Sequence, residues 1–378
     1  MTKSLNVQNQ KKISIVDLSG HYRTIQAEVE KAVCDVLSSG SYILGQNVQK
    51  LESELAEYLD SKHVITCANG TDAIVLSLMA LGIKLGDEVI TVSHSFFATS
   101  EAIALVGAKP VFVDIKEDDF NIDVSKIEKA ITKNTKAIIP VHLYGQACEI
   151  SSVIDVARKH NLYVVEDCAQ AVGAKFHNKK VGTFGDTGTI SFFPTKNLGA
   201  FGDGGAVCTN SDDVAQKIRQ LRVHGSSKRY VHDYIGLNSR LDEVQAAILR
   251  IGLKYLDEWN TKRQNAAKYY DLLFENVPEV ITPRVKPNCN HVFHQYTIRV
   301  KNRDLLCEKL QERNIESIIY YPIPIHLQNA FKYLGCKAGY LLATEGIADE
   351  ILSLPMYPVI TRDVQELVVE SIKDILRK

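Results

Sequence analysis

The stretch Ser191–Gly205, SFFPTKNLGAFGDGG, decides how the rest of this 378-residue sequence is interpreted. It opens as the apolar end of an expected buried strand, breaks at Pro194, and places Lys196 on a turn followed by four glycines. Glycine lets a backbone approach a flat ligand closely. A lysine amine removed from water can lose its proton and attack a carbonyl, which makes Schiff-base chemistry possible. Taken alone, the stretch is more simply a surface lysine beside a flexible loop, so the decision rests on what lies upstream.

Length, charge and cysteine content limit the class of protein. A chain of 378 residues can hold two domains, and a net charge of −1 without a dense basic run argues against nucleic-acid binding. The eight cysteines include no CxxC pair, which argues against zinc and disulfides and favours a reducing cytoplasm. The polar N-terminus has no signal-peptide core, and no apolar run approaches the roughly 18 residues of a membrane span. We therefore expect a cytoplasmic protein without a metal, nucleic acid or membrane as partner, and a loose tail at residues 1–12.

Short apolar strands alternate with amphipathic helices through the middle of the chain. Strands are expected at residues 63–67, 88–92, 110–114, 137–141, 162–166, 187–192 and 206–209. Helices are expected at residues 22–38, 48–59, 72–82, 97–106, 124–131 and 150–160. This order predicts an α/β fold with a mainly parallel sheet covered on both faces. In such sheets, ligands bind beyond the carboxyl ends of the strands.

The first two strand ends carry residues suited to a phosphate and a ring. Gly70, Thr71 and Asp72 follow the first strand and can begin a helix, whose positive end binds anions. Taken alone, an ordinary capped helix start is the simpler explanation of them. Phe96 and Phe97 follow the second strand, and two adjacent aromatics there cannot both face one core. One of them can cover an aromatic ligand ring, although core packing is the default.

An acid ends the fifth strand, in the sequence LYVVED. Asp167 can hold a pyridine nitrogen protonated, or it can cap a following helix. An anion site, an aromatic plate, an acid and a lysine would then meet at one edge of the sheet. That combination is what pyridoxal 5′-phosphate (PLP) requires: a phosphate grip, a ring stack, a pyridinium partner and a Schiff-base lysine.

The remaining sequence predicts a connector and a second domain. From Asn238 a long helix is expected to run through Gly252, leading into a small α+β domain. Domain limits are expected at residues 13–261 and 262–378. In the small domain we expect strands at 292–300 and 316–321 and helices at 304–313, 340–351 and 363–378. Two prolines make Tyr320–Gln328, YYPIPIHLQ, a stiff loop that presents its tyrosines and His326. Tyr42, in the break after the first helix, can line a cleft or staple the next helix.

Six motifs, in this order and spacing, resemble the DegT/StrS-like sugar-nucleotide aminotransferases. They are CANGTDAI, VEDCAQAVGA, SFFPTKNLGAFGDGGA, RVHGSS, GLNSRLDEVQAAIL and YYPIPIHLQ. The resemblance covers roughly residues 13–378. It implies a fold-type I, aspartate-aminotransferase-like PLP enzyme.

The resemblance also assigns roles to individual residues. Lys196 matches the Schiff-base lysine, Asp167 the partner of the pyridine nitrogen, and Gln170 a residue near the cofactor 3-oxygen. Phe96 matches the ring-stacking aromatic. The phosphate cup matches Gly70, Thr71, Asp72 and Ser191. Asn238 matches a residue that family members donate to the phosphate of the neighbouring subunit, which implies a homodimer with shared sites.

Within the family, the sequence resembles most the enzymes that aminate C3 of a nucleotide-linked sugar. The implied substrate is a dTDP-3-keto-6-deoxyhexose, with L-glutamate as donor, for surface-polysaccharide (O-antigen, lipopolysaccharide) or other glycan synthesis. A UDP-linked 3-keto uronic acid is the alternative sugar. Phe193 stands where related enzymes carry histidine or tyrosine, so that contact is absent here. Candidate substrate contacts are Tyr42, Lys228, Arg240, Tyr321 and His326, with Arg229 a weaker one.

Two other functions fit parts of the sequence. A non-enzymatic PLP-binding regulator could use the same scaffold, but it would not need a catalytic lysine. PLP-related dehydration occurs in family branches that carry histidine at the lysine position, so Lys196 disfavours it.

Overall fold

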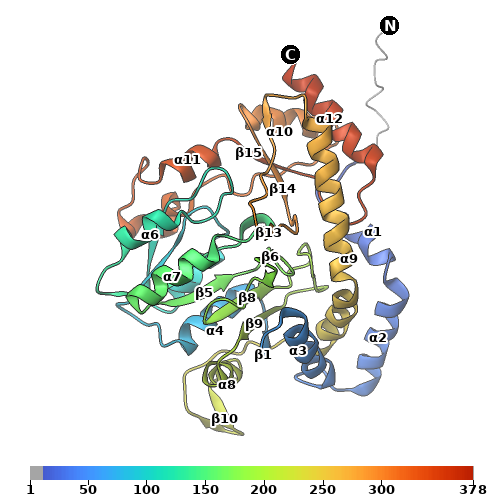
Figure 1. Ribbon diagram of the computed structural model, residues 1–378. Helices are drawn as coiled ribbons and strands as arrows, with labels where there is room; N and C mark the ends of the chain where they lie inside the picture. The colour runs from blue at the N-terminus through green and yellow to red at the C-terminus, as the bar shows by residue number, and fades with distance from the viewer. Residues whose placement is uncertain (1–11, 378) are drawn as a thin grey trace.

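A computed structural model describes residues 12–377, so nearly all of the expected loose tail lies outside the described residues (Figure 1). The helices are α1 (Leu18–Arg23), α2 (Gln26–Ser39), α3 (Gln46–Leu59), α4 (Gly70–Ala80), α5 (Ala98–Leu105), α6 (Val124–Ala130), α7 (Ile150–His160), α8 (Asp212–Leu221), α9 (Glu243–Phe274), α10 (Arg303–Glu312), α11 (Leu342–Ala348) and α12 (Arg362–Leu376). None of them is both long and apolar enough to cross a membrane.

A seven-stranded sheet forms the centre of the large part of the molecule. Its strands, in spatial order, are β1 (His63–Cys67), β9 (Gly205–Thr209), β8 (Thr187–Ser191), β5 (Tyr163–Asp167), β4 (Thr135–Ile139), β2 (Glu88–Val92) and β3 (Lys109–Val113). Strand β9 runs antiparallel to both neighbours, and the pairs among β8, β5, β4, β2 and β3 are parallel. The mainly parallel sheet expected from the sequence is therefore confirmed.

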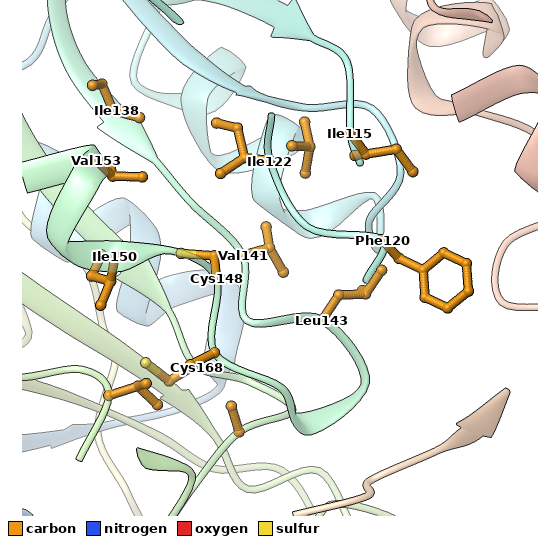
Figure 2. Close-up of a cluster of buried hydrophobic side chains, with 14 of the residues drawn as sticks. Ile115, Phe120, Ile122, Ile138, Val141, Leu143, Cys148, Ile150, Val153 and Cys168 are labelled. Atoms are coloured by element: carbon orange, nitrogen blue, oxygen red, sulfur yellow. The ribbon is translucent and has the colours of Figure 1, made fainter. Parts of the chain in front are cut away.

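Neighbouring residues in a strand point to opposite sides of the sheet. Because both sides of these strands are apolar, helices cover both faces. Ile138 and Val164 pack in one hydrophobic cluster with Val153 of α7, and Figure 2 shows Ile138 and Val153 in that cluster. The next residues along the same strands, Ile139 and Val165, pack in a second cluster with α4 and α5. Strands buried on both faces read as continuous apolar runs, which is why the sequence located them well.

A second, smaller sheet lies in the C-terminal part. It contains β12 (Val280–Ile281), β14 (Tyr296–Val300) and β15 (Ile351–Leu354), all antiparallel, with α10 and α12 packed in the same cluster. Short pairings complete the structure: β6 (Lys175–Phe176) with β7 (Lys179–Lys180) and β13 (Cys289–Asn290), and β10 (Ser226–Lys228) with β11 (Val231–His232).

Several sequence predictions were wrong in detail. The strand expected at 316–321 is a single bridge between Ile318 and Ser353. The helix expected at 340–351 spans only Leu342–Ala348, and Ile351 begins β15, because a short apolar run such as ILSL fits either structure. The helix expected at 22–38 is divided into α1 and α2, since Thr24 hydrogen-bonds His21 and ends α1.

Helix α9 connects the two parts without a break. It starts at Glu243, later than expected, passes the expected domain limit at residue 261, and ends at Phe274 (Figure 1). Gly252 lies buried inside it, where an added Cβ would come within 3.1 Å of Leu198. The domain limits at 261 and 262 stay a prediction.

Candidate active site

A cleft of about 590 Å³ lies at the carboxyl ends of the central strands. Residues from strand ends, helix starts and the C-terminal part line it together. It brings together these residues expected from the sequence: Gly70, Thr71, Asp72, Phe96, Asp167, Gln170, Ser191, Lys196 and Tyr321.

The start of α4 forms one end of the cleft. Asn69 caps the helix by accepting the backbone N–H of Asp72 at 2.8 Å. The N–H groups of the first helical turn have no partner within a helix, so those of Gly70 and Thr71 are suited to an anion. A Cβ on Gly70 would lie 2.7 Å from the Cβ of Ser191, so glycine is required for the helix to approach β8 this closely. The capped helix start is therefore also the place suited to an anion.

The two adjacent phenylalanines after β2 point in different directions. Phe97 packs against Phe331, with 5.3 Å between ring centroids. Phe96 lines the cleft, is 58% exposed, and lies 5.9 Å from the ring of Tyr321. An exposed aromatic over a cleft offers a face to a planar ligand.

Asp167 is held at the end of β5 with its carboxylate in the cleft. Its side chain is buried and accepts hydrogen bonds from the Thr99 hydroxyl at 2.8 Å and the backbone N–H of Ala169 at 3.1 Å. The helix that Asp167 was alternatively expected to cap does not exist, because the next element is β6. A buried carboxylate with only two donors can take a further cationic or N–H partner.

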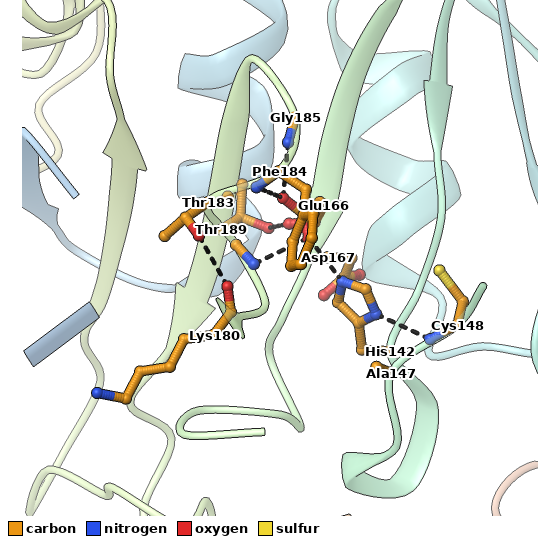
Figure 3. A network of polar contacts seen from close by, with 12 residues as sticks. His142, Ala147, Cys148, Glu166, Asp167, Lys180, Thr183, Phe184, Gly185 and Thr189 are labelled. Carbon is orange, nitrogen blue, oxygen red and sulfur yellow. Dashed lines mark hydrogen bonds and ion pairs between the residues drawn. The ribbon is translucent and has the colours of Figure 1, made fainter. Parts of the chain in front are cut away.

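The neighbouring Glu166 has a structural role, because its carboxylate holds nearby backbone N–H groups and His142 (Figure 3). Its carboxylate is fully buried and accepts the backbone N–H groups of Gly182, Phe184 and Gly185 at 2.7–2.9 Å. His142 Nε2 lies 3.0 Å from the same carboxylate, and these bonds lower the pKa of Glu166 against the effect of burial. Four donors saturate the carboxylate, so this acid fixes the strand end that carries Asp167.

Lys196 occupies the turn that leads from β8 to β9. Its backbone N–H donates to Phe193 at 2.8 Å, and the N–H of Ala200 closes the turn on Phe192 at 2.7 Å. Desolvation lowers the pKa of the Lys196 amine to about 8, although the Asp167 charge acts in the opposite direction. An amine with that pKa is available as a nucleophile and proton carrier near neutral pH.

Gln170 connects the cleft to the proline-containing loop. Its side-chain oxygen accepts the backbone N–H of Tyr144 at 2.7 Å, and its nitrogen donates to the Tyr321 hydroxyl at 3.2 Å. The Tyr144 hydroxyl donates in turn to the carbonyl of Tyr320. The loop is thereby fixed beside the place expected for the cofactor ring.

Other predicted residues are not brought to the cleft of their own chain. His326 is buried, with Nδ1 2.7 Å from the Ser93 hydroxyl and Nε2 3.1 Å from Glu345, so this chain does not present it to the cleft. The Tyr42 hydroxyl donates to the carbonyl of Leu37. Lys228 and Asn238 are exposed and Arg240 half-buried, on the segment around β10 and β11.

Sequence reasoning missed several residues that line the cleft, among them Thr99, His294 and Gln295. Thr99, which binds Asp167, lies three positions after Phe96, so one helical turn of α5 was the available signal. His294 and Gln295 come from the segment just before β14. They sit within a run expected to be a regular strand, and nothing in its spacing marks them.

These residues fit PLP. The helix start is suited to a phosphate, and the close Gly70–Ser191 approach would leave the backbone near it. Phe96 offers a ring face, Asp167 a carboxylate, and Lys196 an amine that burial has made less basic.

Residues 23–373 match the DegT/DnrJ/EryC1/StrS aminotransferase family. Over 367 residues the chain is 49% identical to a protein named pleiotropic regulatory protein from Geobacillus stearothermophilus, covering 97% of this chain and 99% of that one. Over 360 residues it is 45% identical to dTDP-3-amino-3,6-dideoxy-α-D-galactopyranose transaminase from Aneurinibacillus thermoaerophilus, covering 95% and 98%. Other relatives are named as aminotransferases of UDP-linked sugars.

The fold also matches that of solved proteins. DesV from S. venezuelae, determined in complex with a ketimine intermediate, has a TM-score of 0.95 and 39% identity, covering 98% of this chain and 100% of that one. The predicted fold-type I architecture, PLP cofactor and aminotransferase activity are therefore confirmed. The chain belongs to the DegT/DnrJ/EryC1/StrS aminotransferase family.

Proposed function

We propose that the protein aminates C3 of a dTDP-linked 3-keto-6-deoxyhexose, with L-glutamate as donor, in the synthesis of a surface polysaccharide or another glycan. The observation that carries this choice is the charge of the cleft. Among the described residues that line it, Lys196 is the only lysine or arginine, whereas Tyr320 and Tyr321 form the wall beside it. A buried sugar carboxylate would need a cation of its own, so this wall suits a C6 methyl better. The dTDP-sugar transaminase at 45% identity supports the same choice.

The side chains have separable tasks in the reaction. Bound PLP supplies an electron sink for the carbon that carries the transferred amine. Lys196, once freed from the cofactor, would move a proton between the substrate α-carbon and C4′ of the cofactor, as base and then as acid. Asp167 would hold the proton on the ring nitrogen, and Phe96 would fix the ring plane. Glutamate would deliver the amine and the keto-sugar would receive it.

A substrate panel tests this proposal directly. Purified protein with glutamate should aminate the 6-deoxy 3-keto substrate with a kcat/KM at least about tenfold above that for the UDP-linked 3-keto uronic acid, measured by mass spectrometry. One misplaced charge of this kind is expected to cost more than about 1.4 kcal/mol, which is tenfold in rate. A preference for the uronic acid would overturn the sugar and leave the reaction class standing.

The sequence left a non-enzymatic regulator open, and two relatives carry regulatory names, but the family and the site argue against that alternative. The amine of Lys196 and the carboxylate of Asp167 both face the cleft, which a pure PLP binder does not require. Turnover of any member of the panel would exclude a purely regulatory role.

We also propose a homodimer with shared sites. The hairpin of β10 and β11 extends from the large part, and Tyr230 and Ile235 beside it are 82% and 90% exposed. Exposed apolar side chains next to Asn238 fit a contact with a second copy. In that copy's cleft, Asn238 would reach the phosphate, and Arg240 and Lys228 would bind the nucleotide diphosphate.

Mixing two inactive variants tests the shared site. Lys196→Ala chains and Asn238→Ala chains should each show little activity alone. A mixed dimer has one site with both changes and one with neither, so activity should reappear once subunits exchange. Exchange is followed by native mass spectrometry, and dead heterodimers would refute the shared site.

A further inference from the structure

His294 lies in the same cleft as Lys196 and contacts the residue that follows it. The side chain is 4% exposed and comes from the segment between β13 and β14. Its Nδ1 lies 3.2 Å from the side-chain oxygen of Asn197. The contact joins the lysine turn of the large part to the segment that leads into the small sheet.

The surrounding hydrogen bonds determine which nitrogen of His294 carries the proton. Asn197 Nδ2 donates to the carbonyl of Val292 at 3.0 Å and to Asn260 Oδ1 at 2.7 Å. Asn260 in turn donates its own Nδ2 to the carbonyl of Val172 at 3.2 Å, which fixes its orientation. The oxygen of Asn197 must therefore face His294, and an oxygen can only accept. Nδ1 of His294 carries the hydrogen.

The other ring nitrogen faces a donor. Gln295 Nε2 lies 3.4 Å from His294 Nε2, which leaves Nε2 as an acceptor. Arg263 Nη1 donates to the carbonyls of Phe293 and His294, at 3.3 and 3.4 Å, and so places a fixed positive charge near the ring. Burial, Lys196 and Arg263 together hold the pKa of His294 well below its usual range. The ring is a neutral Nδ1–H tautomer.

We propose that His294 is a positioning residue for the aminotransferase reaction: its Nδ1–H braces Asn197 and thereby the turn that carries Lys196. The brace ties the lysine turn to α9 through Asn260 and to the 291–295 segment. A neutral ring also adds no positive charge beside the amine, whose facing charged group is Asp167. The proposal rests on the assignment of Lys196 as the cofactor lysine.

Three substitutions separate this role from packing. His294→Asn places its amide nitrogen near the position of Nδ1, so it can still donate to Asn197. His294→Gln places its amide nitrogen near Nε2, and His294→Leu removes both nitrogens while keeping volume. In the Gln and Leu variants the buried side-chain oxygen of Asn197 loses its hydrogen-bond donor. The fold can tolerate this loss, but the turn that carries Lys196 is then no longer held in place.

The readouts are kcat, KM and the titration of Lys196. We expect His294→Asn to keep kcat within about threefold of wild type, and the Gln and Leu variants to lose about 10- to 100-fold with little change in KM. In the full chain without cofactor, pH-dependent acylation of Lys196, quantified by mass spectrometry, should report an apparent pKa near about 8 for wild type and the Asn variant. In the Gln and Leu variants it should move up towards the ordinary lysine value, as water enters the loosened turn.

The results divide cleanly. His294 would be a packing residue if His294→Leu kept the wild-type kcat and the wild-type titration of Lys196. The same conclusion would follow if all three variants lost kcat equally, in step with their melting temperatures, while the titration of Lys196 did not change. A cofactor bound at another lysine would overturn the proposed function, yet the titration in the cofactor-free chain would still test the brace.

Discussion

Replacing Lys196 with alanine should lower transamination by at least about 10³-fold, since one residue supplies both the covalent attachment and the proton transfers. The variant should still bind PLP, because the start of α4 would hold the phosphate independently of the lysine. In wild type, borohydride should bleach the absorbance of the bound cofactor and fix a pyridoxyl group on Lys196, as peptide mapping would show. A pyridoxyl group on any other lysine would contradict the site described above.

Lys180 provides the matched control. Burial also lowers the pKa of its amine, and it lies over the ring of Tyr58, away from the cleft. Lys180→Ala should therefore keep near-normal turnover and cofactor absorbance, even if it melts at a lower temperature.

Lys196→Ala should not destabilise the cofactor-free fold at neutral pH. The folded pKa of Lys196 is about 8, below its unfolded value, so the folded state binds fewer protons between those two values. Stability then rises with pH through that interval, and at pH 7 the residue lowers stability. Lys196→Ala is expected to melt at the wild-type temperature or above it. A large drop would mean that its activity loss reflects unfolding.

Asp167→Asn should cost about 3–4 kcal/mol in barrier height, or roughly 10²- to 10³-fold in kcat, by removing a preorganised charge beside the ring nitrogen. Asparagine has the same shape, and the Thr99 hydroxyl can turn to accept from its amide, so folding should change little. Steady-state kinetics and thermal melts measure the two quantities separately.

Thr99→Val serves as the comparison for Asp167. It removes the hydroxyl that donates to the carboxylate at 2.8 Å but leaves the charge in place. Its effect should be clearly smaller than that of Asp167→Asn, at about tenfold. Near-normal turnover in Asp167→Asn would show that this carboxylate only satisfies local N–H groups.

The residues that sequence reasoning located share one property: local chain features mark them. Strands β1 and β2 were predicted at their observed limits because continuous apolar runs bounded by turns are distinctive. Asp167 was identified because an acid that ends such a run needs a partner, and Lys196 because it follows a strand end on a glycine-rich turn. The resemblance to a known family then supplied Gln170 and Ser191, which no local pattern distinguishes.

What could not be predicted depends on contacts between distant segments. His294 meets Asn197 only because two parts of the chain, 97 residues apart, fold onto each other. His326 looked exposed on a stiff loop, yet Ser93 and Glu345 from elsewhere engage both ring nitrogens. Short strands such as β15 depend on their partner strand and have no signature of their own.

Helix α9 also limits how the gene can change in length. It is one continuous helix of 32 residues, about 48 Å long at 1.5 Å per residue. Its Asn260 accepts a hydrogen bond from Asn197, and its Arg263 donates to the carbonyl of His294. A single codon gained or lost before Asn260 would rotate everything downstream by about 100° and carry both side chains away from their partners. Insertions and deletions should therefore accumulate among descendants in the β10–β11 hairpin tip and be purged from this helix.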